Sequence, residues 1–292
     1  DLRSETIEMT LIGPKIKFNF NTNISLCGAN SECLINNKKI DMNKTLIIKE
    51  GDVSSHPVWR NEECALESTK RVVRIAQKYK KKIHILHIST KEEIDFFADK
   101  KENVTFEITP QHLTLFAPNC YEKLKTFCQM NPPLRSKDHY DRLWDAVKES
   151  LVSTIGSDHA PHTKEDKNKK YPLSPSGMPG VQTLLPVMLD HVNKGKLKLE
   201  QLIKLVCENP SDLFGIKNKG YIKENYDADL TIVDMNKDVV IKDNWIESKC
   251  GWTPFNNYKV KGFPVATIVN GETVMENGKI NKLNGKPLVF DA

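Results

Sequence analysis

The chain lacks the features that mark membrane and secreted proteins. None of its apolar runs approaches the ~18–20 residues that a membrane-spanning helix requires, so we expect no membrane contact. The first residues, DLRSETIEMT, show no basic start followed by an apolar stretch, which argues against a secretory signal. The seven cysteines include no C-x-x-C pair, and such an odd, dispersed set predicts free thiols in a reducing, cytoplasmic compartment.

A strong excess of one charge is also missing. With 28% charged residues and a net charge of +5 among 292 residues, the composition is that of an ordinary globular protein. Lysines gather at residues 77–83, at a predicted helix end, and at residues 164–170, in a predicted loop. Nucleic-acid binding needs a clustered basic face, so we interpret both runs as solvated surface and expect no nucleic-acid partner.

From about residue 44, short apolar runs alternate with amphipathic segments. The apolar runs predict strands at residues 44–50, 81–90, 104–110 and 151–158. The amphipathic segments predict helices at residues 61–80, 91–100, 138–149, 180–192, 199–207 and 209–214. This alternation indicates parallel βαβ units, in either a barrel or a doubly wound sheet. After about residue 218 the pattern is typical of a small antiparallel β unit with a hairpin turn at Asn270-Gly271.

Potential metal ligands follow two of the predicted strands. His87 ends the stretch IHILH, and Asp158 ends STIGSD. Catalytic groups of parallel α/β folds gather at the carboxyl ends of strands, and an imidazole with a carboxylate suits zinc. His162 follows Asp158 by one short turn and could carry protons or hold substrate. A satisfied core histidine at His87 and a turn-capping role for Asp158 remain the alternatives.

Several longer stretches resemble the dihydroorotases, which are cyclic amidohydrolases of the metal-dependent amidohydrolase superfamily. The stretches that carry the resemblance are HILHIST, EITPQHLTL, QMNPPLRSKDHYDRLWDAV, SDHAPHTKED, SPSGMPGVQTLLPVML and KCGWTPFNNYKVKGFPVATIVNG. They occur in the order of the family and cover about residues 52–280. The resemblance implies a TIM-like (β/α)8 barrel that is incomplete or divergent at its N-terminal strands. It divides the chain into a divergent segment at residues 1–43, a barrel portion at 44–218 and a small C-terminal β unit at 219–292.

The resemblance also implies roles for individual residues. His87 and Asp158 would ligate Zn2+, in a mononuclear or binuclear centre, and Asp158 would act as general base and acid. The substrate would be bound by Asn131, His162 and the backbone around Ser176 and Gly177. Among the neighbouring residues, Arg135 is either a carboxylate contact or a solvent-facing loop residue, His112 and His159 are supporting groups, and His56 is a loop histidine.

The activity that the resemblance implies is reversible hydrolysis of the cyclic amide of (S)-dihydroorotate to N-carbamoyl-L-aspartate, a step of pyrimidine biosynthesis. The partners would be this small molecule and a second copy of the chain in a homodimer. Two other hypotheses remain open. The chain could be a catalytically impaired relative with a scaffold role, or it could act on a hydantoin, dihydropyrimidine or allantoin ring.

The chain departs from the family at its N-terminal side. Such enzymes have an H-x-H pair after the first barrel strand, whereas the first histidine here is His56. We find no bridging Lys at the expected place either. About 218 residues precede the β unit, fewer than the ~250 typical of a closed barrel. Two ligands, His87 and Asp158, would not retain zinc tightly, so further ligands, a fragment and a loss of catalysis are all open.

Overall fold

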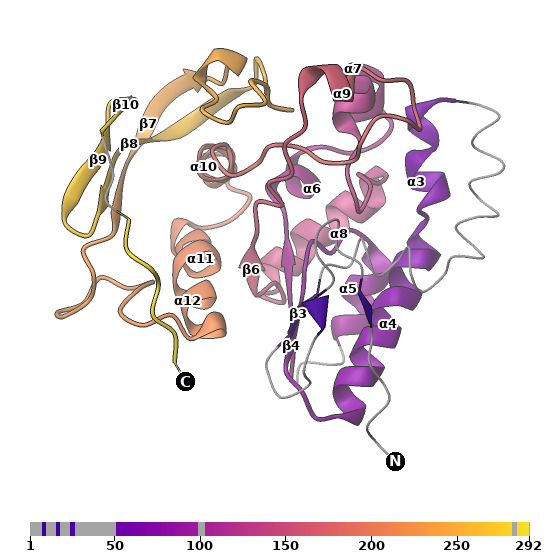
Figure 1. The fold of residues 1–292 in the computed structure, drawn as a ribbon, viewed down its shortest axis with the longest axis horizontal. Helices are drawn as coiled ribbons and strands as arrows, with labels where there is room; N and C mark the ends of the chain where they lie inside the picture. The colour runs from indigo at the N-terminus through magenta and orange to yellow at the C-terminus, as the bar shows by residue number, and fades with distance from the viewer. Residues whose placement is uncertain are drawn as a thin grey trace. The chain divides into compact units, whose positions relative to one another are not determined.

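The computed structural model describes residues 51–98, 103–281 and 285–291. It also describes the backbone of three short strands, β1 (Glu8–Met9), β2 (Ile16–Lys17) and β3 (Ile24–Leu26). The strand predicted at residues 44–50 lies outside these ranges. The chain forms two compact units (Figure 1), which are Asp1–Leu151 with Glu165–Gly177 (unit 1) and Val152–Lys164 with Met178–Ala292 (unit 2). The predicted boundaries at residues 43 and 218 stay predictions.

Unit 1 contains a parallel sheet in which β4 (Ile83–Ile85) lies between β3 and β5 (Val104–Ile108). Ile83 is paired with Ile24 on one side and with Val104 on the other. This arrangement confirms the parallel βαβ units. The strand predicted at residues 81–90 is shorter than expected, because the positive φ of His87 (43°) is incompatible with extended backbone.

The helices of unit 1 begin where side chains cap their first N–H groups. The Asn61 side chain accepts a hydrogen bond from the Cys64 N–H at 3.1 Å and starts α4 (Glu62–Lys78). At α5 (Lys91–Ala98), the Thr90 hydroxyl accepts from the Glu93 N–H at 3.1 Å and donates to the Glu93 carboxylate at 2.8 Å. α5 packs against both α4 and α8 (Lys137–Lys148) (Figure 1). The three helices confirm the predictions to within two residues at each end.

Short elements connect these helices in unit 1 and carry much of the candidate site. They are η1 (Val53–Ser55), α3 (His56–Trp59), α6 (Pro110–Thr114), α7 (Asn119–Leu124) and η2 (Lys125–Cys128), followed by the C-terminal end of α9 (Lys164–Lys167). None of these short elements stood out in the sequence, because each is too brief to show an apolar period.

Unit 2 begins with β6 (Thr154–Ile155), which covers only two of the eight residues predicted as a strand. Helices and a π-helical turn follow, as α10 (Leu184–Asn193), α11 (Leu199–Ile203), η3 (Lys204–Glu208) and α12 (Asn209–Phe214). Predicted helices at 180–192, 199–207 and 209–214 are thus confirmed, the first with a later start. None of the helices in the described part of the chain is long and apolar enough to cross a bilayer.

The rest of unit 2 is an antiparallel sheet in the order β10-β9-β8-β7. Its strands are β7 (Leu230–Val240), β8 (Lys259–Val269), β9 (Glu272–Glu276) and β10 (Lys279–Ile280), and η4 (Asp243–Trp245) lies between β7 and β8. Asn270 and Gly271, both with positive φ, join β8 to β9 and confirm the predicted hairpin. α10 packs on β8 (Figure 1), where a Cβ on Gly262 would lie 2.9 Å from Leu189 Cβ.

Candidate functional site

His87 lies two residues beyond β4 in a backbone conformation that is rare for a residue with a side chain. Its φ is 43° and only 2% of its surface is exposed. The Ile88 N–H donates to the Glu107 carbonyl at 2.8 Å and holds this turn against β5. Strained backbone of this kind persists where the surroundings impose it, commonly at functional sites. The strain therefore favours a functional role over the alternative of an ordinary core histidine.

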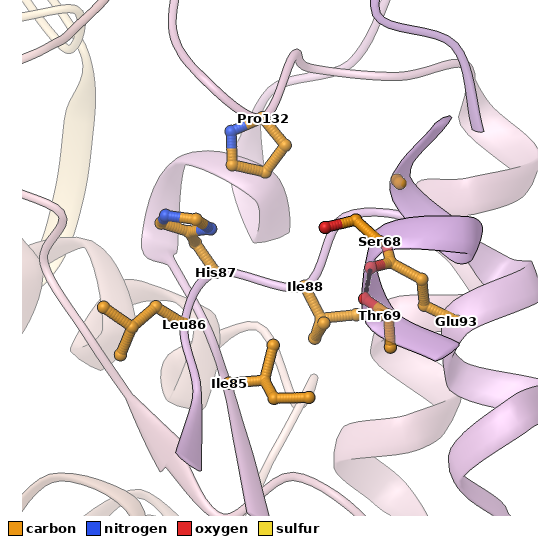
Figure 2. A pocket seen from close by; sticks show the side chains of 9 residues that line it. Ser68, Thr69, Ile85, Leu86, His87, Ile88, Glu93 and Pro132 are labelled. Atoms are coloured by element: carbon orange, nitrogen blue, oxygen red, sulfur yellow. Dashed lines mark hydrogen bonds between the residues drawn. The ribbon is translucent and has the colours of Figure 1, made fainter. Parts of the chain in front are cut away.

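A cavity of about 10 Å3, large enough for about one water molecule, lies beside His87 (Figure 2). The opposite wall of this cavity is polar and comes from α4 and α5. There Glu93, 4% exposed, accepts hydrogen bonds from the Thr69 hydroxyl at 2.7 Å and from the Thr90 hydroxyl at 2.8 Å. Ser68 adds a further hydroxyl to the lining. His87 thus lines the same small cavity as a buried carboxylate that neighbouring hydroxyls hold in place.

His112, in α6 just beyond β5, is a supporting group rather than a free ligand. Its Nε2 donates to the Pro132 carbonyl at 3.2 Å, and its Nδ1 lies 2.8 Å from the Thr109 hydroxyl, which donates to it. Burial, together with the neighbouring His87, lowers the pKa of His112 to about 3. Both ring nitrogens are engaged and the ring is neutral, which agrees with the structural role expected from the sequence.

Asn131 is oriented by a histidine that the sequence reasoning undervalued. His56 is 1% exposed, and its Nε2 lies 3.0 Å from both the Met130 carbonyl and Asn131 Oδ1. Because both neighbours are acceptors, Nε2 carries the proton, and the Tyr171 hydroxyl faces Nδ1 at 3.3 Å. Burial, helped by the charge of Arg60, lowers the pKa of His56 to about 3. Because His56 holds Oδ1 of Asn131, the Nδ2 group of Asn131, which is a donor, points away from His56.

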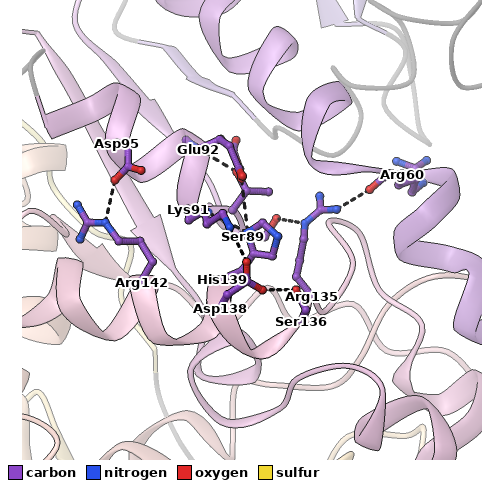
Figure 3. A network of polar contacts seen from close by, with 12 residues as sticks. Arg60, Ser89, Lys91, Glu92, Asp95, Arg135, Ser136, Asp138, His139 and Arg142 are labelled. Atoms are coloured by element: carbon purple, nitrogen blue, oxygen red, sulfur yellow. Dashed lines mark hydrogen bonds and ion pairs between the residues drawn. The ribbon is translucent and has the colours of Figure 1, made fainter.

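Arg135 is buried, with 5% of its surface exposed, so the alternative of a solvent-facing loop residue is wrong. Its Nε donates to the Ser89 hydroxyl at 3.2 Å and its Nη1 donates to the Arg60 carbonyl at 2.6 Å (Figure 3). Nη2 is buried and has no hydrogen-bond partner in the described part of the chain. One guanidinium thus connects the turn after His87, the helix that carries His56 and the segment that begins with Asn131.

A polar network continues from Arg135 along the N-terminal ends of α5 and α8 (Figure 3). Lys91 pairs with Asp138 at 2.5 Å, and the Lys91 N–H donates to His139 Nδ1 at 3.1 Å. The hydrogen bond from Lys91, with a second from Ser136, holds the pKa of Asp138 well below its usual range. The network fixes the two loops that precede these helices, which are the loops of His87 and Asn131.

The loop of Ser176 and Gly177 lies against the residues just before Asn131. The Gly177 N–H donates to the Gln129 carbonyl at 2.9 Å, and the Gln129 side chain donates to the Ser176 hydroxyl at 3.1 Å. Gly177 has a φ of 141°, a conformation that side chains rarely adopt. Unit 1 therefore holds the loop of Ser176 and Gly177 against the segment that leads into Asn131, and these three are predicted substrate-binding residues.

The remaining predicted residues, Asp158 and His162, belong to unit 2. Asp158, which follows β6, has a φ of 40° and repeats the unusual backbone of His87. The Trp252 indole donates to the His162 carbonyl at 2.7 Å, and the Gly180 N–H donates to His159 Nδ1 at 3.1 Å. The loop DHAPH is thus held at both ends, and His159 supports it as expected. A common site for His87 and Asp158 stays a prediction.

Zinc was the cofactor implied by the resemblance. Within residues 51–98, 103–281 and 285–291, no three His, Cys, Asp or Glu side chains are grouped so as to hold a metal ion. Catalytic zinc sites use three protein ligands, and the candidates here, His87 and Asp158, are two. The described residues therefore do not complete a zinc centre, and such a centre requires further donors.

The amidohydrolase family model matches residues 40–274, and a second model, carboxyltransferase domain, subdomain A and B, matches residues 1–56. The chain belongs to the amidohydrolase family. This amidohydrolase is 40% identical over 223 residues to the dihydroorotase of Pyrococcus furiosus, covering 76% of our chain and 51% of that protein. It is 36% identical over 251 residues to the dihydroorotase of Methanosphaera stadtmanae, covering 85% and 56%. The chain spans about half the length of these curated relatives.

Solved structures confirm the fold of the amidohydrolase. The L-hydantoinase (dihydropyrimidinase) of Arthrobacter aurescens superimposes with a TM-score of 0.78 at 29% identity, covering 84% of this chain and 56% of that one. The dihydropyrimidinase of Brevibacillus agri also gives 0.78, at 26% identity, covering 83% and 56%. Part of the α/β amidohydrolase barrel, with a small β unit at its C-terminal side, is thus the fold of this chain.

Two residues of this amidohydrolase escaped the sequence reasoning. His56 precedes Pro57, a residue favoured in the first turn of a helix, and this signal could have placed it at a helix start. Lys167 is 0% exposed, so the interpretation of residues 164–170 as solvated surface is wrong for this lysine. Nothing in the run KEDKNKK distinguishes Lys167 from its exposed neighbours.

Proposed function

We propose that this amidohydrolase chain forms part of a dihydroorotase, which reversibly hydrolyses the cyclic amide of (S)-dihydroorotate to N-carbamoyl-L-aspartate in pyrimidine biosynthesis. The curated dihydroorotases that resemble it support this activity. The observation that carries the proposal is the convergence in unit 1 of Asn131, oriented by His56, with the loop of Ser176 and Gly177. These are the residues through which the resemblance expects the substrate to be bound.

Each residue has a chemical role in this proposal. The Nδ2 group of Asn131 donates to the substrate carboxylate, with the positive field of Arg135 nearby, and His162 is a second substrate contact. The backbone around Ser176 and Gly177 contacts the pyrimidine ring. His87 is a metal ligand in this proposal. One or two zinc ions would be bound, and they would need donors beyond the described residues.

The proton transfers fall to Asp158. In the hydrolytic direction, water adds to the ring carbonyl carbon and a new C–O bond forms while Asp158 takes up the water proton. The ring C–N bond then breaks, and Asp158 returns the proton to the leaving nitrogen, which becomes the carbamoyl NH2 group. Ring closure runs the same steps in reverse.

Asp158→Ala tests this assignment. We expect turnover of dihydroorotate to fall by about three orders of magnitude or more, because the proton carrier is lost, while circular dichroism and thermal unfolding stay unchanged. Glu165→Gln, at an exposed acid in the first turn of α9, is the matched control and should keep full activity. Near-wild-type turnover in Asp158→Ala would overturn the role of Asp158.

The ring specificity can be tested at Asn131. Dihydroorotate carries a carboxylate and unsubstituted hydantoin does not, so Asn131→Ala should raise the KM for dihydroorotate about tenfold or more and leave hydantoin hydrolysis, if present, unaffected. Hydantoin hydrolysis that exceeds dihydroorotate hydrolysis in the wild-type protein would instead favour the related-ring activity.

A catalytically impaired amidohydrolase with a scaffold role is the second candidate, and it is favoured because the described residues contain no group of three or more side chains that could hold a metal ion. Elemental analysis and turnover of the wild-type protein separate the two candidates. Near-stoichiometric zinc with formation of carbamoyl-aspartate supports the enzyme, and absence of both supports the scaffold. The homodimer and the cytoplasmic location belong to the proposal as well, and sedimentation velocity measures the former.

A further inference from the structure

Lys167 is buried in a segment whose other charged residues face solvent. It ends α9 with 0% of its surface exposed, whereas the side chains of Lys164 and Lys169 are 51% and 52% exposed. Lysine is almost never fully buried unless its charge is satisfied, since removing an ammonium group from water is costly. Burial lowers the pKa of Lys167 to about 7, because the charged form is less stable in the interior than in water. The buried ammonium group must therefore be stabilised by nearby hydrogen-bond acceptors.

The ammonium group of Lys167 donates to three backbone carbonyls. Nζ lies 3.0 Å from the Gln129 oxygen, 2.8 Å from that of Pro175 and 3.1 Å from that of Gly177. An ammonium group has three N–H donors, so these carbonyls match its full capacity. Lys167 therefore ties the loop at residues 175–177 to the residue that lies two positions before Asn131.

A second set of hydrogen bonds holds the same loop from the Gln129 side chain. Gln129 Nε2 donates to the Ser174 carbonyl at 3.0 Å, and the Ser174 hydroxyl donates to Gln129 Oε1 at 2.5 Å. Ser174 is buried, as are Gln129 and Gly177. Polar networks of this kind fix one arrangement when every member is satisfied.

The direction of the carbonyls determines where the neighbouring N–H groups point. Across a trans peptide bond, the carbonyl of one residue and the N–H of the next point in opposite directions. The bonds after Gln129 and Pro175 are not among the cis bonds of the described chain. Since both carbonyls point toward Lys167, the N–H groups of Met130 and Ser176 point away from it. A positive charge on the carbonyl side also polarises these peptide groups and strengthens their N–H donors.

We propose that Lys167 is a positioning residue, which orders the loop at residues 174–177 and presents the Ser176 N–H to an oxygen of a cyclic imide or ureide ring. This inference rests on the proposed function, because it assumes that the substrate ring binds at this loop. Lys167 itself touches neither the ring nor the reacting atoms. Its effect should thus be on ring binding rather than on bond breaking.

Lys167→Met tests the inference, because methionine keeps the apolar stem and removes all three donors. Lys170→Met, at an exposed lysine three residues away, is the matched control. We expect hydrogen exchange in a peptide covering residues 171–178 to accelerate about tenfold or more in Lys167→Met and to stay unchanged in Lys170→Met. The KM for dihydroorotate should rise about tenfold while kcat changes less than about threefold. Lys167→Arg, which keeps the charge and its donors, should recover part of both effects.

Unchanged exchange and KM in folded Lys167→Met would overturn the inference, and so would a fall in kcat with KM unchanged. If Lys167→Met does not fold, Ser174→Ala takes its place. We then expect a smaller rise in the exchange rate and in KM, and the absence of any rise would overturn the inference. The exchange measurement needs neither substrate nor turnover. If wild-type protein does not bind dihydroorotate, the proposed function fails, while accelerated exchange still assigns the ordering of the loop to Lys167.

Discussion

The two units of this amidohydrolase satisfy their buried charges in different ways. In unit 1, the buried cations Arg135 and Lys167 donate to hydroxyl and backbone carbonyl oxygens. In unit 2, the buried carboxylate of Asp190 is paired with the ammonium of Lys194 at 2.5 Å and accepts from the Lys261 N–H at 3.1 Å. A charge paired with its opposite is largely neutralised, whereas a cation held by neutral oxygens keeps its field.

The field of Arg135 reaches the candidate site. It contributes to lowering the pKa values of His56, His112 and His139, and Arg135 forms no ion pair within the described ranges of the chain. A positive interior beside Asn131 suits an anionic substrate, and dihydroorotate is an anion. The described charged side chains of unit 2, by contrast, are paired with one another or lie at the surface. The buried cations of unit 1 thus agree with the anionic substrate of the proposed function, and burying them costs stability.

The largest expected effect that tests this comparison is the acid sensitivity of unit 1. Unfolded histidine takes up a proton below pH 6.5, whereas His56 and His112 stay neutral until about pH 3, so stability falls as the pH drops from 6.5 toward 3. Each histidine should lower the free energy of unfolding by up to about 5 kcal/mol over this window. His191 in unit 2, with a pKa of about 4, is one such group against these two in unit 1, so unit 2 should lose less stability. Hydrogen exchange at pH 7 and pH 5 measures the difference, and α10 losing protection before α3 and α6 would contradict it.

Arg135→Met should have the next largest effect. It leaves the Ser89 hydroxyl and the Arg60 carbonyl without their donor, and we expect a loss of about 3–4 kcal/mol in the free energy of unfolding. Asp190→Asn in unit 2 should cost about 1–2 kcal/mol, because the Lys194 side chain is 49% exposed and can be solvated instead. Urea denaturation measures both variants. Equal losses would remove the distinction between neutral and charged partners.

Substitutions of two glycines, one in each unit, test the backbone strain of the units, with smaller expected losses of stability. Gly177→Ala in unit 1 should cost about 2 kcal/mol, because a φ of 141° belongs almost entirely to glycine. Gly271→Ala, in the β8–β9 turn, should cost about 1 kcal/mol, since its φ of 82° is less restrictive and no atom lies within 4 Å of the added Cβ. Thermal unfolding measures both, and a larger loss for Gly271→Ala would reverse the ranking.

The smallest effect should come from a surface pair of unit 2. Lys164 lies 3.0 Å from Asp243, with side chains that are 51% and 29% exposed. Lys164→Gln should change the free energy of unfolding by less than about 0.5 kcal/mol, because such pairs gain little in water and are screened by salt. A loss above about 1 kcal/mol, or one insensitive to salt, would show that charge pairing at the surface of unit 2 matters more than this comparison allows.

The elements that sequence reasoning predicted well are those whose cause is local. Asn61 starts α4 by accepting from the third residue beyond it, and the Asn270-Gly271 turn sets its own hairpin. β4 was predicted to extend too far because the positive φ of His87 interrupts extended backbone, and nothing in an apolar run announces such strain.

By itself, the sequence determined the α/β order of the amidohydrolase, its helix caps and its hairpin, and it singled out His87, Asn131 and Asp158. These depend on neighbours a few residues apart. Only the tertiary structure decided that Arg135 and Lys167 are buried, because their partners lie 46 and 38 residues away along the chain, at Ser89 and Gln129. A long polar side chain is stable in the interior only when distant segments bring oxygens to it, and that arrangement exists once the chain has folded.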